Sequence, residues 1–195
     1  MKKNLILIIG FCCFTMMSFT MNDIIDFLST GTELNFNNEK YELAWSSHPN
    51  ATYFKQEYLR KSDKLEKYEK MLMVEAIKTT LNPENVSQMK INELTNIKKV
   101  NPIVSFKQVQ VSNQNDKIIS FTISGGNILE WNVYRYQQQQ AGKENMIILY
   151  AYSYRNYAST KEDVTKFMDY VKNNENKMIE TITKTNIPKV KINQS

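Results

Sequence analysis

The stretch ATYFKQEYLRKSDKLEKYEKML, residues 51–72, decides how the rest of the chain is arranged. In its first part, residues 53–59, the side chains follow the two-residue alternation that is typical of an extended strand. From Asp63 on, the apolar residues Leu65 and Tyr68 recur at helical spacing among charged ones. We expect a strand, a turn at residues 61–63, and a helical turn that Leu65 and Tyr68 clamp onto the core. Residues 71–79 fit either a continued helix or a third strand.

The segments on either side of this stretch predict a hairpin and a helix. Residues 41–46 alternate, and the SSHPN turn after them joins them to the strand at residues 53–59. Downstream, Asn82 offers an N-cap oxygen and Pro83 suits the first helical position. We expect a helix over residues 83–99. Its apolar stripe consists of Val86, Met89, Glu93 or Leu94, and Ile97.

Four strand patterns and a second helix complete the chain. The strand patterns cover residues 103–111, residues 118–124, a segment around Leu129, Trp131 and Val133, and residues 146–154. The turns between them are short, and short turns join antiparallel neighbours. A helix over residues 160–183 follows, with Ser159 and Glu162 as a capping box. Its apolar stripe consists of Val164, Phe167, Met168, Val171 and Met178.

These elements predict an α+β fold. We expect an antiparallel sheet, made of a hairpin plus a four-stranded meander, flanked by two amphipathic helices. Residues 21–195 form a single domain with a frayed C-terminal tail from about residue 188, because no linker or internal repeat divides them.

Residues 1–20 have the layout of a secretory signal peptide. Lys2 and Lys3 precede an apolar run, and the small residues Ser18 and Thr20 precede Met21. We expect cleavage after Thr20 and export to the periplasm or the medium. An uncleaved anchor or a lipoprotein is the alternative, although the apolar run is shorter than the ~20 residues that span a bilayer.

The composition excludes several classes of protein. Cys12 and Cys13 both lie in the leader, so the mature chain has no cysteine for disulfides, thiolate chemistry or cysteine-bound metals. The formal charge of +5 drops to +3 when Lys2 and Lys3 leave with the leader. Both signs are interspersed, without the basic stripe of a nucleic-acid binder. We expect no nucleic-acid partner, and membrane contact only if the leader is retained.

Catalytic and metal-binding patterns are few. The only histidine, His48, lies in the expected turn before Pro49, where an exposed position is typical. One histidine does not make a zinc site, and the glycines that a phosphate-binding loop needs are missing. We expect no metal and no cofactor. Paired carboxylates remain as acid–base candidates. The glutamates in or near regular elements are Glu57, Glu66, Glu69, Glu75 and Glu130.

Tyrosines are the most suggestive side chains for ligand binding. Within one strand Tyr134 and Tyr136 share a face, and within the next Tyr150, Tyr152 and Tyr154 do. If the two strands pair, we expect the five tyrosines to cover one side of the sheet. They would form a ligand platform if that side is open, or packing residues if a helix covers it.

The segment from Gln56 to Met71, with the pattern Q-E-Y-L-x-K-x-x-x-L-x-x-Y-x-x-M, resembles a segment of small uncharacterised secreted bacterial proteins. This chain has Ser62 and Asp63 where a glycine is common, and Tyr68 where tryptophan is frequent. The order of elements is similar to the PsbP/Mog1-type α+β layout. The resemblance implies location and fold class and assigns no functional residue.

The sequence favours an exported, non-enzymatic binding or accessory protein of a bacterial envelope. Its partner would be an envelope protein or a small ligand. Two alternatives stay open: a carboxylate-based hydrolase acting on envelope glycans, and a structural protein anchored in the membrane by its leader.

Overall fold

The computed structural model describes residues 24–111, 115–141 and 144–193. The expected leader, its cleavage after Thr20 and both cysteines lie outside the described residues. The described residues form eight strands and two helices. Their bounds are β1 (Glu33–Phe36), β2 (Glu39–Asn50), β3 (Tyr53–Leu59), β4 (Lys70–Lys78), α1 (Pro83–Lys98), β5 (Ser105–Val109), β6 (Asp116–Gly125), β7 (Ile128–Ala141), β8 (Glu144–Tyr157) and α2 (Lys161–Lys184).

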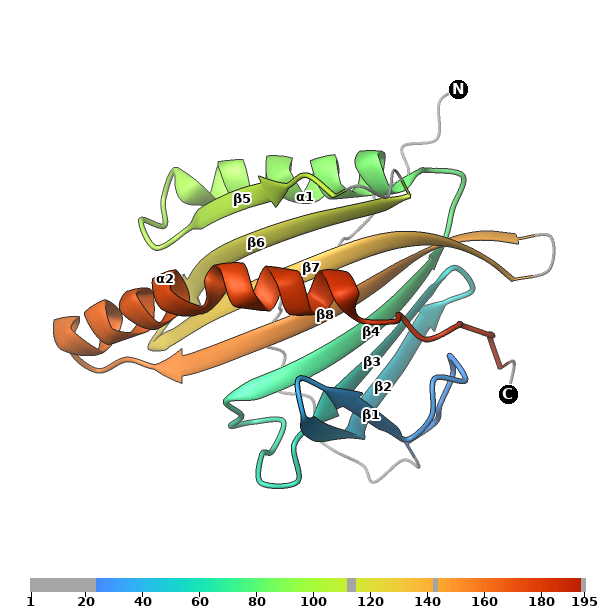
Figure 1. The fold of residues 1–195 in the computed structure, drawn as a ribbon, viewed down its shortest axis with the longest axis horizontal. Helices are drawn as coiled ribbons and strands as arrows, with labels where there is room; N and C mark the ends of the chain where they lie inside the picture. Colours follow the sequence, from blue (N-terminus) through green and yellow to red (C-terminus); the bar gives the residue numbers. More distant parts are fainter. Residues whose placement is uncertain (1–23, 112–114, 142–143, 194–195) are drawn as a thin grey trace.

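All eight strands belong to one antiparallel sheet in the order β1-β2-β3-β4-β8-β7-β6-β5. Two four-stranded meanders, β1 to β4 and β5 to β8, meet where β4 pairs with β8 (Figure 1). Strands account for 46% of the structure and helices for 24%. The expected α+β class is therefore wrong. The four-stranded meander is present as β5 to β8, but the expected hairpin is part of a second four-stranded meander in the same sheet. The fold is dominated by one large sheet.

Strand β4 is the reason for this difference. Residues 71–79, which fitted either a helix or a strand, form most of β4 and pair with β3 on one side and β8 on the other. Seven consecutive residues of β4 are buried. A strand that is covered on both faces is apolar on both, so it lacks the alternation that marks a half-buried strand. The short β1, which pairs with β2, lengthens the sheet further.

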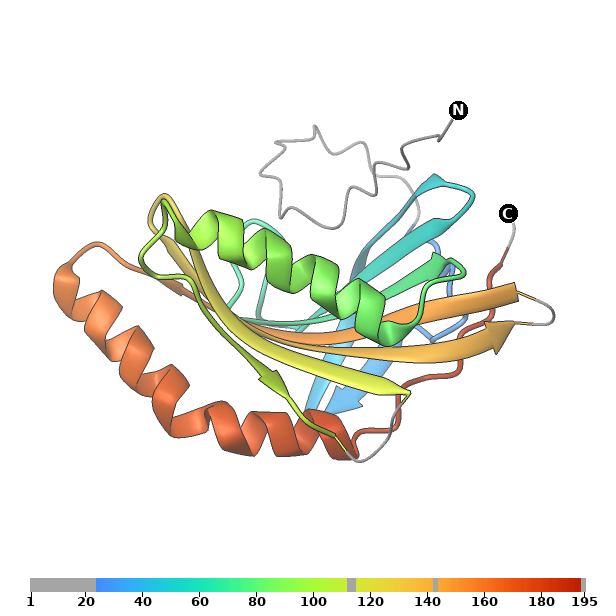
Figure 2. The same ribbon diagram turned by 90° about the horizontal axis from the view of Figure 1, so that it is seen from above.

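The two helices lie on opposite faces of the sheet (Figure 2). α1 begins at the N-cap Asn82, as expected, and packs Val86 and Leu94 into one core. α2 begins at Thr160, whose capping partner is Asp163, so the expected box is shifted by one residue. α2 buries residues against the other core; they are Phe167, Val171, Met178, Ile179 and Ile182.

Two segments outside the regular elements, residues 60–69 and residues 188–193, differ from expectation. Residues 60–69 form a tight loop closed by a bridge between Lys64 and Lys67, and not a helical turn. Residues 188–193 are not frayed, because Val190 is buried and Asn193 donates its backbone N–H to Phe27. Among the described residues, no helix is long and apolar enough to cross a membrane.

Candidate functional site

One row of side chains crosses four strands on the sheet face that packs against α1. Tyr136 of β7 lies opposite Leu149 of β8, Leu149 opposite Glu75 of β4, and Glu75 opposite Lys55 of β3. Residues directly opposite each other in paired strands point to the same face. The row therefore places the Glu75 carboxyl next to the Lys55 ammonium, and Tyr136 two strands away on the same face, with the apolar Leu149 between Glu75 and Tyr136.

Glu75 is the centre of this row. Its side chain is in the middle of a nine-residue strand and the residue is only 4% exposed. Burial raises the pKa of Glu75, since desolvation disfavours the charged carboxylate, and the nearby Lys55 ammonium and the Tyr53 hydroxyl only partly oppose that rise. Tyr53, also on β3, donates its hydroxyl to Glu75, and burial raises the pKa of Tyr53 as well.

Two carboxyls share one ammonium at this position. Lys55 Nζ lies 2.8 Å from Glu57 Oε1 and 4.0 Å from Glu75 Oε1. The two glutamates therefore lie close together on neighbouring strands, with a cation between them. The side chains of Lys55 and Glu57 remain partly exposed, so this end of the row reaches solvent.

Helix α1 adds a second ammonium and carboxyl to the same face. Lys90 is 3% exposed, and its Nζ lies 3.1 Å from Glu93 Oε1. Its Nζ also lies 5.3 Å and 5.8 Å from the ring centres of Phe121 and Tyr134. A buried lysine is held here by one carboxylate and two aromatic faces.

The Tyr136 hydroxyl is exceptional within this group. Tyr136 is 1% exposed, and its hydroxyl has no hydrogen-bond partner within residues 24–111, 115–141 and 144–193. Burial raises the pKa of Tyr136, and the carboxyls of Glu75 and Glu93 raise it further. We call the set formed by Tyr53, Lys55, Glu57, Glu75, Lys90, Glu93 and Tyr136 the Glu75 cluster.

The five tyrosines expected on one side of the sheet are divided between its two faces. Tyr150 of β8 lies opposite Arg135, and Tyr136 of β7 lies opposite Leu149. In this register the tyrosines of β7 and those of β8 point to opposite faces of the sheet. Tyr134 and Tyr136 face α1; the remaining three, Tyr150, Tyr152 and Tyr154, face α2. The prediction of a single tyrosine-covered face is wrong, because a sequence shows alternation within a strand and not the register between strands.

The α2-facing tyrosines are covered by other elements. Tyr154 stacks on Tyr170 of α2 with ring centres 4.1 Å apart, and Phe36 of β1 contacts the rings of Tyr150 and Tyr152. All three tyrosines are buried. They pack the core under α2, and their ligand-binding role stays a prediction.

The other acid–base candidates have separate surroundings. Glu130 forms a buried ion pair with Arg155 and accepts a hydrogen bond from the Tyr68 hydroxyl. Glu66 is exposed. His48 is exposed as expected, but it belongs to strand β2 and not to a turn, and it stacks on Phe54 at 4.3 Å.

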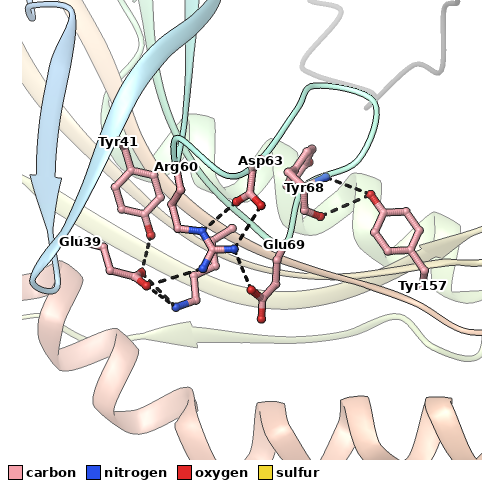
Figure 3. Close-up of polar contacts among 8 residues, drawn as sticks. Glu39, Tyr41, Arg60, Asp63, Tyr68, Glu69 and Tyr157 are labelled. Carbon is pink, nitrogen blue, oxygen red and sulfur yellow. Dashed lines mark hydrogen bonds and ion pairs between the residues drawn. The ribbon is translucent and has the colours of Figure 1, made fainter.

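The loop after β3 carries a second polar network, around Arg60 (Figure 3). The Arg60 guanidinium donates to Asp63 at 2.8 Å and to Glu69 at 2.7 Å. Lys70 donates to Glu39 at 2.8 Å, and Tyr41 also donates to that carboxylate. Although burial raises the pKa of Glu39, the bonds from Lys70 and Tyr41 outweigh it and lower the pKa.

This network holds the loop in place. The Arg60 guanidinium donates hydrogen bonds to the carboxylates of Asp63 and Glu69, and these bonds raise the pKa of Arg60. Tyr157 accepts the backbone N–H of Tyr68 beside it, as Figure 3 shows. We assign the Arg60 network an architectural role and the Glu75 cluster the role of candidate site.

Most of the Glu75 cluster escaped prediction from sequence. Only Glu57, Glu75 and Tyr136 were candidates, and nothing linked them. Two signals were present. Glu75 is the one charged residue between Lys70 and Lys78, the two ends of β4. Lys90 stands four residues from Val86 in the buried stripe of α1, where the expected member was Met89. Charged residues in apolar positions are expensive, so they are informative.

Among the described residues, no group of three or more His, Cys, Asp or Glu side chains could hold a metal ion. The polar groups of the Glu75 cluster are two hydroxyls, two ammoniums and three carboxyls. Such a set suits hydrogen bonding to a small molecule better than metal coordination.

Residues 28–187 match the model of one protein family, from before β1 to after α2. The chain belongs to that family, an uncharacterised one. No curated protein matches the chain, and no solved structure matches it.

Proposed function

We propose that this chain is an exported, non-enzymatic binding protein of the bacterial envelope, and that the Glu75 cluster recognises a small polar ligand. One observation carries the proposal: the described residues offer no hydrogen-bond partner to the buried Tyr136 hydroxyl. Buried polar groups nearly always have a partner, so an exception calls for an explanation. A ligand atom that bonds to this hydroxyl supplies one.

The surroundings of Tyr136 support binding over catalysis. The carboxyls of Glu57 and Glu75 share the Lys55 ammonium, which holds them in place. The only histidine is exposed and lies on β2, not in the cluster. Tyr53 and Glu57 are partly exposed, so the cluster reaches solvent along β3. Fixed hydrogen-bonding groups at one end of an apolar floor are typical of small-molecule sites.

Thermal melting of the purified protein tests this function. The probe is a protein-free, small-molecule extract of bacterial envelopes, applied to the wild-type protein, Tyr136→Phe and the matched control Tyr134→Phe. We expect the extract to raise the melting temperature of the wild type and of Tyr134→Phe, because ligand binding stabilises the folded state. The rise should shrink in Tyr136→Phe. An equal rise in Tyr136→Phe, or none in the wild type, contradicts a site at Tyr136.

Export has its own test. The leader pattern supports removal of residues 1–20. Mass spectrometry of the protein expressed with its leader in a bacterial host should find a mature chain that begins at Met21. An intact chain from Met1 would favour the anchored structural protein.

One observation favours a glycan hydrolase as the second candidate. Lys55 brings two carboxyls together, and burial raises the pKa of Glu75, as a general acid requires. A hydrolase predicts release of reducing sugars from cell-wall glycan, and loss of that release in Glu75→Gln and in Glu57→Gln. Absence of release in the wild type contradicts the hydrolase.

A further inference from the structure

The Glu75 cluster carries one more negative charge than positive charge when all its groups are ionised. Its acids are Glu57, Glu75 and Glu93, and its bases are Lys55 and Lys90. The adjoining pair does not change this balance, because Lys117, opposite Tyr136 on β6, pairs with Glu84 of α1. The uncharged titratable groups that face Glu75 are Tyr53 and Tyr136.

An unbalanced charge is costly at this depth, since Glu75 is 4% exposed. Two species can relieve it: a proton on Glu75 or a cation beside it. Burial raises the pKa of Glu75, which favours the proton in the free protein. A cation that displaces this proton would restore the balance and keep the carboxylate charged.

The Tyr136 hydroxyl indicates what kind of cation would fit. Its oxygen has two lone pairs, and the described part of the chain provides no donor for them. Glu75 adds further acceptors on the same row of the sheet. An ammonium group has several N–H donors for these acceptors, whereas a bare metal ion needs more ligands than this set offers.

The fold already holds an ammonium in a comparable setting. The Lys90 Nζ lies between Glu93 and the rings of Phe121 and Tyr134, on the same sheet face. A buried cation there lies against a carboxylate and two aromatic rings. Tyr136 lies two residues from Tyr134 on β7 and offers an aromatic hydroxyl on the same sheet face. Glu75 offers a carboxylate on that face.

We infer that the Glu75 cluster binds the ammonium group of a small primary amine in exchange for the proton of Glu75. In this exchange the Glu75 carboxylic acid and R–NH3⁺ give a carboxylate–ammonium pair and one released proton. The inference rests on the proposed function, because it names the ligand class of the same site.

Nuclear magnetic resonance titration with methylammonium chloride at constant ionic strength tests the inference. Sodium chloride and tetramethylammonium chloride are the control salts, since neither cation has N–H donors. We expect saturable shifts of residues 73–77 and 134–136 with methylammonium alone. The affinity should rise by up to tenfold per pH unit while Glu75 is protonated and then level off.

Three variants make the result specific. Glu75→Gln should abolish binding at every pH, and Tyr136→Phe should weaken binding at least fivefold. Glu144→Gln, an exposed acid paired with Lys78, should bind as the wild type does. Equal responses to sodium, or unchanged binding in Glu75→Gln, would overturn the inference.

The two proposals fail in distinguishable ways. A Tyr136-dependent stabilisation by envelope extract without methylammonium binding overturns the amine and leaves the binding function standing. If neither the extract nor methylammonium gives a Tyr136-dependent response, both proposals are wrong.

Discussion

Replacing Tyr136 by phenylalanine should stabilise the ligand-free protein. The substitution keeps the ring, which packs against Tyr134 with ring centres 6.3 Å apart, and removes only the hydroxyl. An unsatisfied buried polar group costs about 1–3 kcal/mol. Because residues 24–193, where described, offer that hydroxyl no partner, we expect the free energy of unfolding to rise by about 1 kcal/mol.

Urea denaturation after refolding, which removes any bound ligand, measures this change. In urea the m-value should not change. In a thermal scan the melting temperature should rise by roughly 2–4 °C. Tyr58→Phe is the matched control, because Tyr58 is also a buried residue and its hydroxyl contacts Thr30, Gln56 and the Gly31 carbonyl. That variant should lose about 1–2 kcal/mol. A loss of 1 kcal/mol or more in Tyr136→Phe would refute the reasoning, since the hydroxyl would then have a structural partner.

Three further predictions concern stability. Because Glu75 keeps its proton in a pH range where an unfolded carboxyl has lost it, the wild-type free energy of unfolding should fall as pH rises through that range, by at most about 1.4 kcal/mol per pH unit. Glu75→Gln should lack this slope in urea titrations from pH 4 to 8, and an equal slope would exclude Glu75 as its source. Leu72→Ala, in the fully buried centre of β4, should cost about 2–5 kcal/mol by chemical denaturation, and a cost below 1 kcal/mol would contradict a central β4. Arg60→Lys should lower the free energy of unfolding by about 1 kcal/mol, because an ammonium cannot replace the guanidinium that bonds to both Asp63 and Glu69. Proteolysis of the 60–69 loop should also become faster in this variant. An unchanged cleavage rate would contradict the role of Arg60 in holding the loop.

Much of the fold could be predicted because its signals are local. The alternation at residues 53–59 gives β3 with the observed bounds, and Asn82 with Pro83 gives the start of α1. Residues 71–79 had no local signal, because burial on both faces removes alternation. Their strand pairing depends on β3 and β8, which flank β4 in the sheet. β8 is distant from β4 in the sequence, so no local pattern indicates this pairing.

The candidate site could be predicted only in fragments for the same reason. Glu75 and Tyr136 are sixty-one positions apart, and they share a row only because β4 and β7 both flank β8 in one particular register. Shifting that register by one residue would move Tyr136 to the other face. The five-tyrosine platform failed on this point, since it assumed a register that the sequence does not specify.

The location of the binding site is the central claim, and chemical-shift mapping with the envelope small-molecule extract tests it most directly. We predict that the largest shifts fall on residues 53–57, 73–77, 90–93 and 134–136, and that they diminish in Tyr136→Phe. Shifts concentrated on Tyr150, Tyr152 and Tyr154 under α2, or a spectrum that the extract does not change, would contradict a binding site at the Glu75 cluster.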